Sequence, residues 1–174
     1  SDSFQSAFSW IKNTDAADAH MLFDRVRGPY SFWNSNDDAN IADDINTLTR
    51  FLKQGANIGN DVRVNTTSES YLYWDWFIES TGSGASNEDG SINTASTLVD
   101  TTGGISISKF EGTGANATVG HGLGAAPKFV ILKHFDNSAY STVAWHQRVD
   151  TPTTGYLILD ATDAEQNSAA QWNS

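Results

Sequence analysis

The chain has 174 residues, a formal net charge of −11, 21 acidic side chains against 10 Lys and Arg, and no Cys. The shortage of clustered basic side chains argues against binding to nucleic acid or to anionic membranes, because both require neutralisation of phosphates. The lack of Cys excludes disulfide and thiolate metal frameworks, and no apolar run approaches the length of a membrane span.

The first half of the chain predicts a series of short β-strands. They are expected at residues 3–13, 21–27 and 30–34, with two short segments near Ile58 and at 62–64. Residues 41–52 combine apolar side chains at helical spacing with Thr and Phe, which favour strands. We therefore expect a helical turn near Asp43 that passes into a short strand.

The clearest long strand is predicted at residues 70–80, where large side chains occupy both faces. One face carries Leu72, Trp74, Trp76 and Ile78, and the other carries Tyr71, Tyr73, Asp75 and Phe77. If the tryptophans form the core face, the second face still presents three aromatic rings and one charge. Such a face is typical of an interface or a glycan-facing surface. Coverage by a second sheet of the same chain is the alternative.

The second half begins after a stretch rich in Ser, Thr, Gly and Asn at residues 81–103, which we interpret as a linker. Residues 105–108 alternate apolar and polar side chains, as a half-buried strand does. Phe129 to Leu132 form a continuous apolar run, which predicts a strand covered on both faces. Gly120, Gly122 and Gly124 indicate a turn between these strands.

The sequence contains a candidate internal repeat. Three aligned pairs support it: 8–13 with 129–134, Phe23 with Trp145, and 30–34 with 156–160. This predicts two related modules, at residues 1–80 and 104–174, in an all-β fold of antiparallel sheets with helix below about a tenth of residues. We expect Phe8–Ile11 and Phe129–Leu132 to be equivalent central strands.

No constellation of residues predicts catalysis or a metal. Asn34, Asn36 and Asp38 alternate as calcium ligands do, but Ala39 stands at the position that needs Gly and Ile45 at the position of the bidentate Glu. A solvated acidic loop is the favoured interpretation. The four histidines have no mutual spacing typical of zinc ligands, so we expect no metal, no cofactor and no catalytic residues.

Two further local patterns allow a functional and a structural interpretation. Asp75 and Glu79 are the closest approach to a carboxylate pair on one strand, but Phe77 lies between them. His121 in the sequence VGHGLG is flanked by glycines, so we expect it to hydrogen-bond within its own turn rather than to bind a ligand.

Several segments together resemble a repeat module of bacteriophage virion proteins. The most specific are HMLFDRVRG at 20–28 and HGLGAAPKFVILK at 121–133, and FSWIKN, YLYWDWF and the TDAEQNSAAQWNS ending agree with them. Modules of this type are found in tail fibres and other appendages of marine phages and are described as lectin-like or concanavalin-like. The sequence FEGTG at 110–114 and the WHQR at 145–148 depart from the family pattern.

The resemblance implies a non-enzymatic structural or adhesion component of a virion, in a tail fibre or other surface appendage, that binds host-surface glycans. It implies a homo-oligomer, commonly a trimer, or contact with other virion proteins, and it supplies no catalytic set. It also implies an antiparallel β-sandwich of jelly-roll or lectin-like type. In that fold module 1–80 would lack its first strand and module 104–174 its last strands, unless the two halves complete one sandwich. A carbohydrate-active enzyme or a free lectin on the same sandwich is the alternative.

Overall fold

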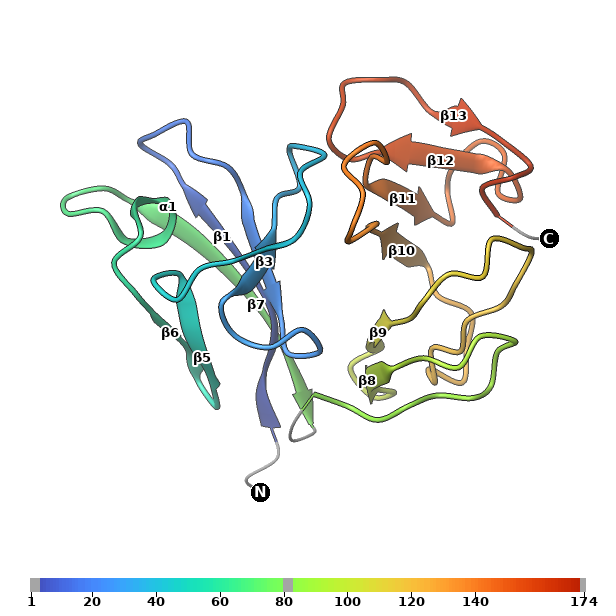
Figure 1. The fold of residues 1–174 in the computed structure, drawn as a ribbon, viewed down its shortest axis with the longest axis horizontal. Coiled ribbons are helices and arrows are strands. Elements are labelled where there is room, and N and C mark those ends of the chain that lie inside the picture. The colour runs from blue at the N-terminus through green and yellow to red at the C-terminus, as the bar shows by residue number, and fades with distance from the viewer. Residues whose placement is uncertain (1–3, 80–82, 173–174) are drawn as a thin grey trace.

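The computed structural model describes residues 4–79 and 83–172 (Figure 1). The fold is nearly all β, with 39% strand and 2% helix, and its sheets are antiparallel and sandwich-like. This confirms the predicted fold class and the low helix content. The single described helix, α1 (Val62–Asn65), is one short turn that Asp61 caps by accepting a hydrogen bond from the Arg63 amide.

The larger sheet has five strands in the order β4-β3-β2-β1-β7. Their bounds are β1 (Phe4–Asn13), β2 (Met21–Asp24), β3 (Ser31–Trp33), β4 (Ala42–Asp43) and β7 (Tyr71–Glu79). The expected helical turn at Asp43 is wrong, because this residue pairs with Ser31 in β4. The short strand expected after it is confirmed by β5 (Leu48–Leu52).

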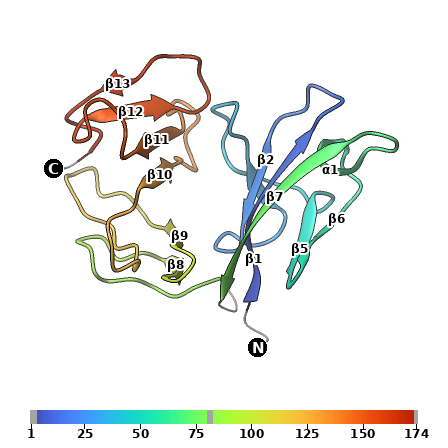
Figure 2. The same ribbon diagram turned by 180° about the vertical axis from the view of Figure 1, so that it is seen from behind.

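One face of this sheet is covered by a hairpin of β5 (Leu48–Leu52) and β6 (Gly55–Ile58) (Figures 1 and 2). Its apolar side chains meet those of the sheet in the main core. The buried residues of this core are Ile11, Met21, Phe23, Phe32, Leu48, Phe51 and Val64. Burial of this apolar surface is the dominant favourable term that holds the hairpin in place.

A second hairpin, β8 (Ser96–Asp100) and β9 (Ile105–Lys109), packs on the opposite side of the sheet. Leu98, 1% exposed, contacts Ala7 and Ile78 there. β8 lies inside the range 81–103 that was expected to be a linker, so that part of the expectation is wrong. Leu98 and Val99 supply the apolar side chains that make a strand possible in an otherwise polar stretch.

The smaller sheet has the order β10-β11-β12-β13. Its strands are β10 (Phe129–Leu132), β11 (Val143–His146), β12 (Gly155–Ile158) and β13 (Gln166–Asn167). The expectation that 129–132 is covered on both faces is wrong. Phe129 is 55% exposed, the next three residues are half-buried, and β10 lies at the edge of the sheet.

The pairing of strands supports the internal repeat at its start. Ser9 of β1 pairs with Phe23 of β2, and Val130 of β10 pairs with Trp145 of β11, as the sequence alignment requires. The two strands therefore relate to their following strands in the same way. The expectation that both are central is wrong for β10, whereas β1 lies between β2 and β7.

Candidate functional site

Exposed aromatic side chains line one face of β1 and β7. We define the tryptophan face as the side chains of Phe8, Trp10, Leu72, Trp74 and Trp76. Leu72, Trp74 and Trp76 are 49%, 43% and 42% exposed. The condition that the tryptophans form the core face is therefore not met along this part of β7.

Pairing between β1 and β7 sets the rings of the tryptophan face against one another. Phe8 lies opposite Trp76 and Trp10 opposite Trp74. The ring centroids of these pairs are 5.2 and 5.7 Å apart, and both pairs have an interplanar angle of 62°. Edge-to-face contacts of this kind fix ring orientation and add stability beyond the area that they bury. The rings on this face therefore form two edge-to-face pairs, Phe8 with Trp76 and Trp10 with Trp74.

The exposure of these rings follows from the size of the hairpin that covers this side. β8 and β9 reach Ile78, which is fully buried, but Leu72, Trp74 and Trp76 on the same face of β7 remain exposed. β7 is also the edge strand of its sheet. Large contiguous apolar patches on the surface of a folded protein commonly mark interaction sites.

His20 fixes one end of the tryptophan face. The Trp10 indole Nε1 donates a hydrogen bond to His20 Nδ1 at 2.9 Å, and the two rings lie 5.6 Å apart. Burial lowers the pKa of His20, and the nearby Lys12 charge lowers it further. Because Nδ1 accepts, the neutral ring carries its proton on Nε2, which remains a donor at the margin of the face.

The opposite side of β7 carries the four residues singled out in the sequence, Tyr71, Tyr73, Asp75 and Phe77, which we call the tyrosine face. Three hydroxyls converge on Asp75: Tyr73 Oη at 2.6 Å, Ser6 Oγ at 2.5 Å and Ser9 Oγ at 3.0 Å. Burial, with the Asp75 hydrogen bond second, raises the pKa of Tyr73 to about 12. The Asp75 carboxylate is thus held by hydrogen bonds within the sheet.

The other two members of the tyrosine face contact different parts of the molecule. Tyr71 donates to the Val62 carbonyl at 2.7 Å and packs against the main core. Phe77 stacks on Phe4, with centroids 5.3 Å apart and an interplanar angle of 11°. Phe4 is 48% exposed. Tyr71 therefore belongs to the core, whereas the stacked rings of Phe4 and Phe77 lie at the surface near the start of β1.

Two other sequence candidates adopt local roles. Asn36 Oδ1 accepts from the His20 amide, and Asn34 Nδ2 donates to Asp37 within the loop once compared with a calcium site. His121 Nδ1 accepts from the Leu123 amide at 3.1 Å, which confirms that this histidine bonds its own turn. Among residues 4–79 and 83–172, no group of three or more His, Asp or Glu is arranged to hold a metal.

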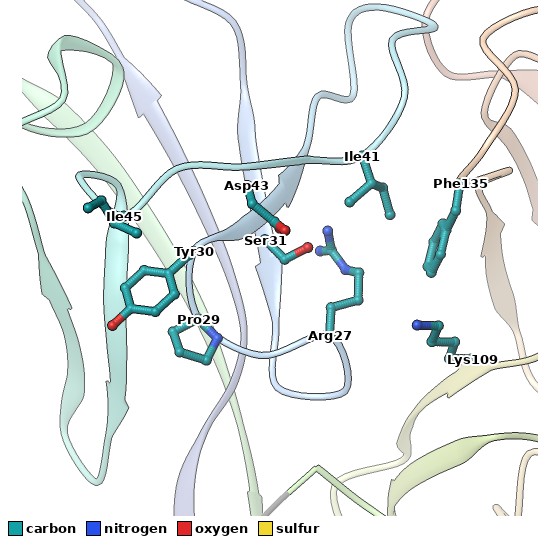
Figure 3. A pocket seen from close by; sticks show the side chains of 9 residues that line it. All are labelled: Arg27, Pro29, Tyr30, Ser31, Ile41, Asp43, Ile45, Lys109 and Phe135. Carbon is teal, nitrogen blue, oxygen red and sulfur yellow. The ribbon is translucent and has the colours of Figure 1, made fainter.

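One pocket, of about 450 Å³, lies where the loop after β2 and strands β3 and β4 approach β9 and the loop after β10 (Figure 3). Arg27 and Lys109 enter it from the two halves of the chain. Arg27 is already paired with Asp24 at 2.5 Å, with both side chains nearly buried, and Lys109 lies 6.0 Å from the Phe135 ring. Arg27 Nη1 is buried without a hydrogen-bond partner in the described part of the chain, but the ion pair with Asp24 and the contact of Lys109 with Phe135 already engage both cations. This pocket is therefore a weaker candidate than the tryptophan face.

The tryptophan face was missed at the sequence level because β7 carries large side chains on both faces. One signal was available in β1. Its residues Ser9 and Asn13 are small and polar and share a face with Ile11, whereas Phe8 and Trp10 share the other. Small residues leave space beside the tyrosines of β7, so they favour the tyrosine side as the inner one.

Comparisons with known proteins return one family. A model described as a domain of unknown function (DUF7483) matches residues 1–174. No curated protein and no solved structure matches the chain. No helix in the described part of the chain is long and apolar enough to cross a membrane.

Proposed function

We propose that this chain, which belongs to the DUF7483 domain family, is a structural or adhesion component of a bacteriophage particle. We place it in a tail fibre or another surface appendage and assign glycan binding to the tryptophan face. The phage assignment rests on the sequence resemblance. The binding assignment rests on the geometry of β1 and β7.

The binding assignment rests on the exposure of Trp74 and Trp76, each of which contacts an aromatic ring of β1 edge to face. A pyranose ring presents a face of C–H groups that packs well on an indole ring, and its hydroxyls then face water or nearby donors. An indole offers a large rigid apolar surface at little cost in conformational entropy. His20 Nε2 and the Trp74 and Trp76 indole N–H groups supply donors at or near this face.

Binding without turnover fits this surface better than hydrolysis. Glycoside hydrolysis uses two carboxyl groups that flank the scissile bond. The five side chains of the tryptophan face carry none, and Asp75 projects to the other side of β7, where three hydroxyls hold it. We therefore propose a non-enzymatic lectin-like role and keep a carbohydrate-active enzyme as the competing outcome.

A glycan array followed by titration of the best ligand tests the proposal. We expect Trp74→Ala and Trp76→Ala each to weaken binding at least about tenfold, as loss of a stacking aromatic residue at a binding hot spot does. The intrinsic tryptophan fluorescence of the wild-type chain should change on saturation. Tyr140→Ala is the matched control, because Tyr140 is 58% exposed and lies in the other half of the chain.

Three outcomes contradict parts of the proposal. Glycan binding that survives the double change Trp74→Ala and Trp76→Ala places the site elsewhere. Hydrolysis of a polysaccharide that Asp75→Asn abolishes supports the enzyme. If no glycan of the host surface binds, the chain has a purely architectural role in the particle.

A further inference from the structure

The repeat extends over four strands with the same pairing throughout. β10, β11, β12 and β13 follow one another as β1, β2, β3 and β4 do, each strand antiparallel to the next. In the first two strands, the pair Trp10–Leu22 corresponds to Ile131–Ala144. In the next two, Leu22–Trp33 corresponds to Ala144–Leu157. In the last two, Ser31–Asp43 corresponds to Gly155–Asn167. β10 is therefore the structural equivalent of β1.

The two equivalent strands differ in their second neighbour. β1 pairs with β7 along its whole length, from Phe4 opposite Glu79 to Asn13 opposite Tyr71. On the corresponding edge of β10, no strand pairs among residues 4–79 and 83–172. The smaller sheet thus lacks, within the described chain, the strand that completes the larger one.

Backbone hydrogen bonds show which groups of β10 face this open edge. The Gln147 amide donates to the Lys128 carbonyl at 3.0 Å, which makes that pair a hydrogen-bonded one. Because such pairs alternate along an antiparallel ladder, the N–H and C=O of Phe129 and Ile131 point away from β11. They are the groups free to pair with an added strand.

The same reasoning applied to β1 supports this assignment. The Arg25 amide donates to the Ala7 carbonyl on the β2 side, and the Thr14 amide donates to the Ser70 carbonyl on the β7 side, both at 2.9 Å. The groups of Phe8 and Trp10 therefore face β7. These are the residues that align with Phe129 and Ile131.

The side chains around β10 also indicate an incomplete layer. Phe129 is 55% exposed, and Lys133 Nζ is buried with no hydrogen-bond partner within the described residues. No acidic residue occurs from 112 to 135, although the chain carries 21 of them. β7 has the opposite character, with Asp75 and Glu79 and no basic residue. β10 is apolar and has Lys128 and Lys133 on either side. It is therefore complementary in charge to a strand like β7, which is aromatic and acidic.

We propose that the outer edge of β10 is a docking site for one antiparallel strand of a partner polypeptide. The partner strand has the chemistry of β7: aromatic side chains on both faces, acidic and not basic. In the register of β1 and β7, the residue equivalent to Trp76 lies opposite Phe129 and the equivalent of Trp74 opposite Ile131. Main-chain hydrogen bonds supply affinity in such strand addition, and alternate side chains supply specificity.

A peptide with the sequence of residues 70–79, SYLYWDWFIE, is the probe. It is titrated into the isotopically labelled chain, and amide exchange is measured residue by residue. We expect saturable one-to-one binding and a rise in protection of about tenfold or more at the Phe129 and Ile131 amides, because exchange reports local opening. A peptide of the same composition with the alternation scrambled should not protect them.

Ile131→Pro tests the backbone contact directly. Proline removes the outward N–H of Ile131 but leaves the bonds to β11, so an edge strand tolerates it. We expect this change to abolish peptide binding, while Ile131→Ala, which keeps the N–H, retains protection at Phe129. Amide shifts of β12 report whether each variant is folded.

The exchange map of the wild-type chain decides the question even if Ile131→Pro does not fold. Protection confined to β10 supports the proposal. Protection on the outer edge of β7, or no saturable binding, overturns it. Self-association of the chain that protects β10 without peptide also overturns it, because the occupant would then be a second copy.

Discussion

Asp75 is the central hydrogen-bond acceptor of the tyrosine face. It lies on the edge strand and accepts hydrogen bonds from Ser6 and Ser9 of β1 and from Tyr73 of its own strand. Hydrogen bonds to a charged acceptor are stronger than neutral ones. The two serines stand on either side of a β-bulge, where Ser6 pairs with Phe77 and Phe8 with Trp76. The extra residue, Ala7, faces the β8–β9 hairpin instead.

This arrangement predicts a stability loss at high pH. The folded pKa of Tyr73 is about 12 against an ordinary value of 10.0, so the folded state holds the phenol proton more tightly than the unfolded state. The stabilisation is complete below pH 10 and is lost as the pH rises from 10 to 12. Urea unfolding at steps across this range should show a steeper fall for the wild type than for Tyr73→Phe.

Tyr140→Phe is the matched control for this titration. Tyr140 is exposed and stacks on His134 in the other half of the chain. We expect the variant to follow the wild-type curve. Parallel curves for the wild type and Tyr73→Phe would show that Tyr73 does not couple to folding in this range.

At the scale of elements, β7 shows what sequence can and cannot predict. The alternation of its side chains located the strand, which begins one residue after the predicted start and extends to the last described residue before the gap; the predicted end at residue 80 lies outside the described residues. The sequence left the inner face open, because both faces carry aromatic residues and only β1 and the two hairpins distinguish them. The sequence assigned the glycan-facing surface to the tyrosine face. Tyr73 on that face is 43% exposed, as Trp74 is, but the tryptophan face presents two such rings, Trp74 and Trp76, beside the exposed Leu72.

The β8–β9 hairpin illustrates a different limit. Its first strand lies in a polar stretch, and only Leu98 and Val99 identify it. Leu98 finds its apolar partners, Ala7 and Ile78, in the first half of the chain. Such contacts between distant segments have no local signature, so composition alone favoured a linker.

Leu98→Ala tests the coupling of the hairpin to the large sheet. Deleting a buried leucine side chain leaves a cavity and costs about 2–5 kcal/mol in the free energy of unfolding. Leu157→Ala is the control, because Leu157 is 40% exposed and exposed changes stay within about 0.5 kcal/mol. Both values come from urea denaturation followed by circular dichroism. Equal midpoints would show that the hairpin does not stabilise the fold.

For the whole molecule, the repeat was visible in sequence where strands carry distinctive side chains. The alignment of 8–13 with 129–134 and of Phe23 with Trp145 agrees with the strand pairing. Further along it was displaced by two residues, since pairing equates Ser31 with Gly155 rather than with Leu157. Loops of different length separate these strands, and sequence similarity does not determine where such gaps fall. The open edge of β10 was not predictable, because it depends on which distant strands pair, and no strand among the described residues pairs there.

The two faces of β7 allow one strand to serve two partners. If the tryptophan face binds a glycan, the open pair Phe4 and Phe77 on the other side is available for assembly. The phage resemblance implies a homo-oligomer, commonly a trimer, or contact with other virion proteins, and a closed trimer would bury three copies of this pair. We expect the chain to sediment as a trimer, and Phe4→Ser with Phe77→Ser to give a folded monomer that still binds glycan. A monomeric wild type, or an unchanged trimer in the double variant, would contradict assembly through this pair.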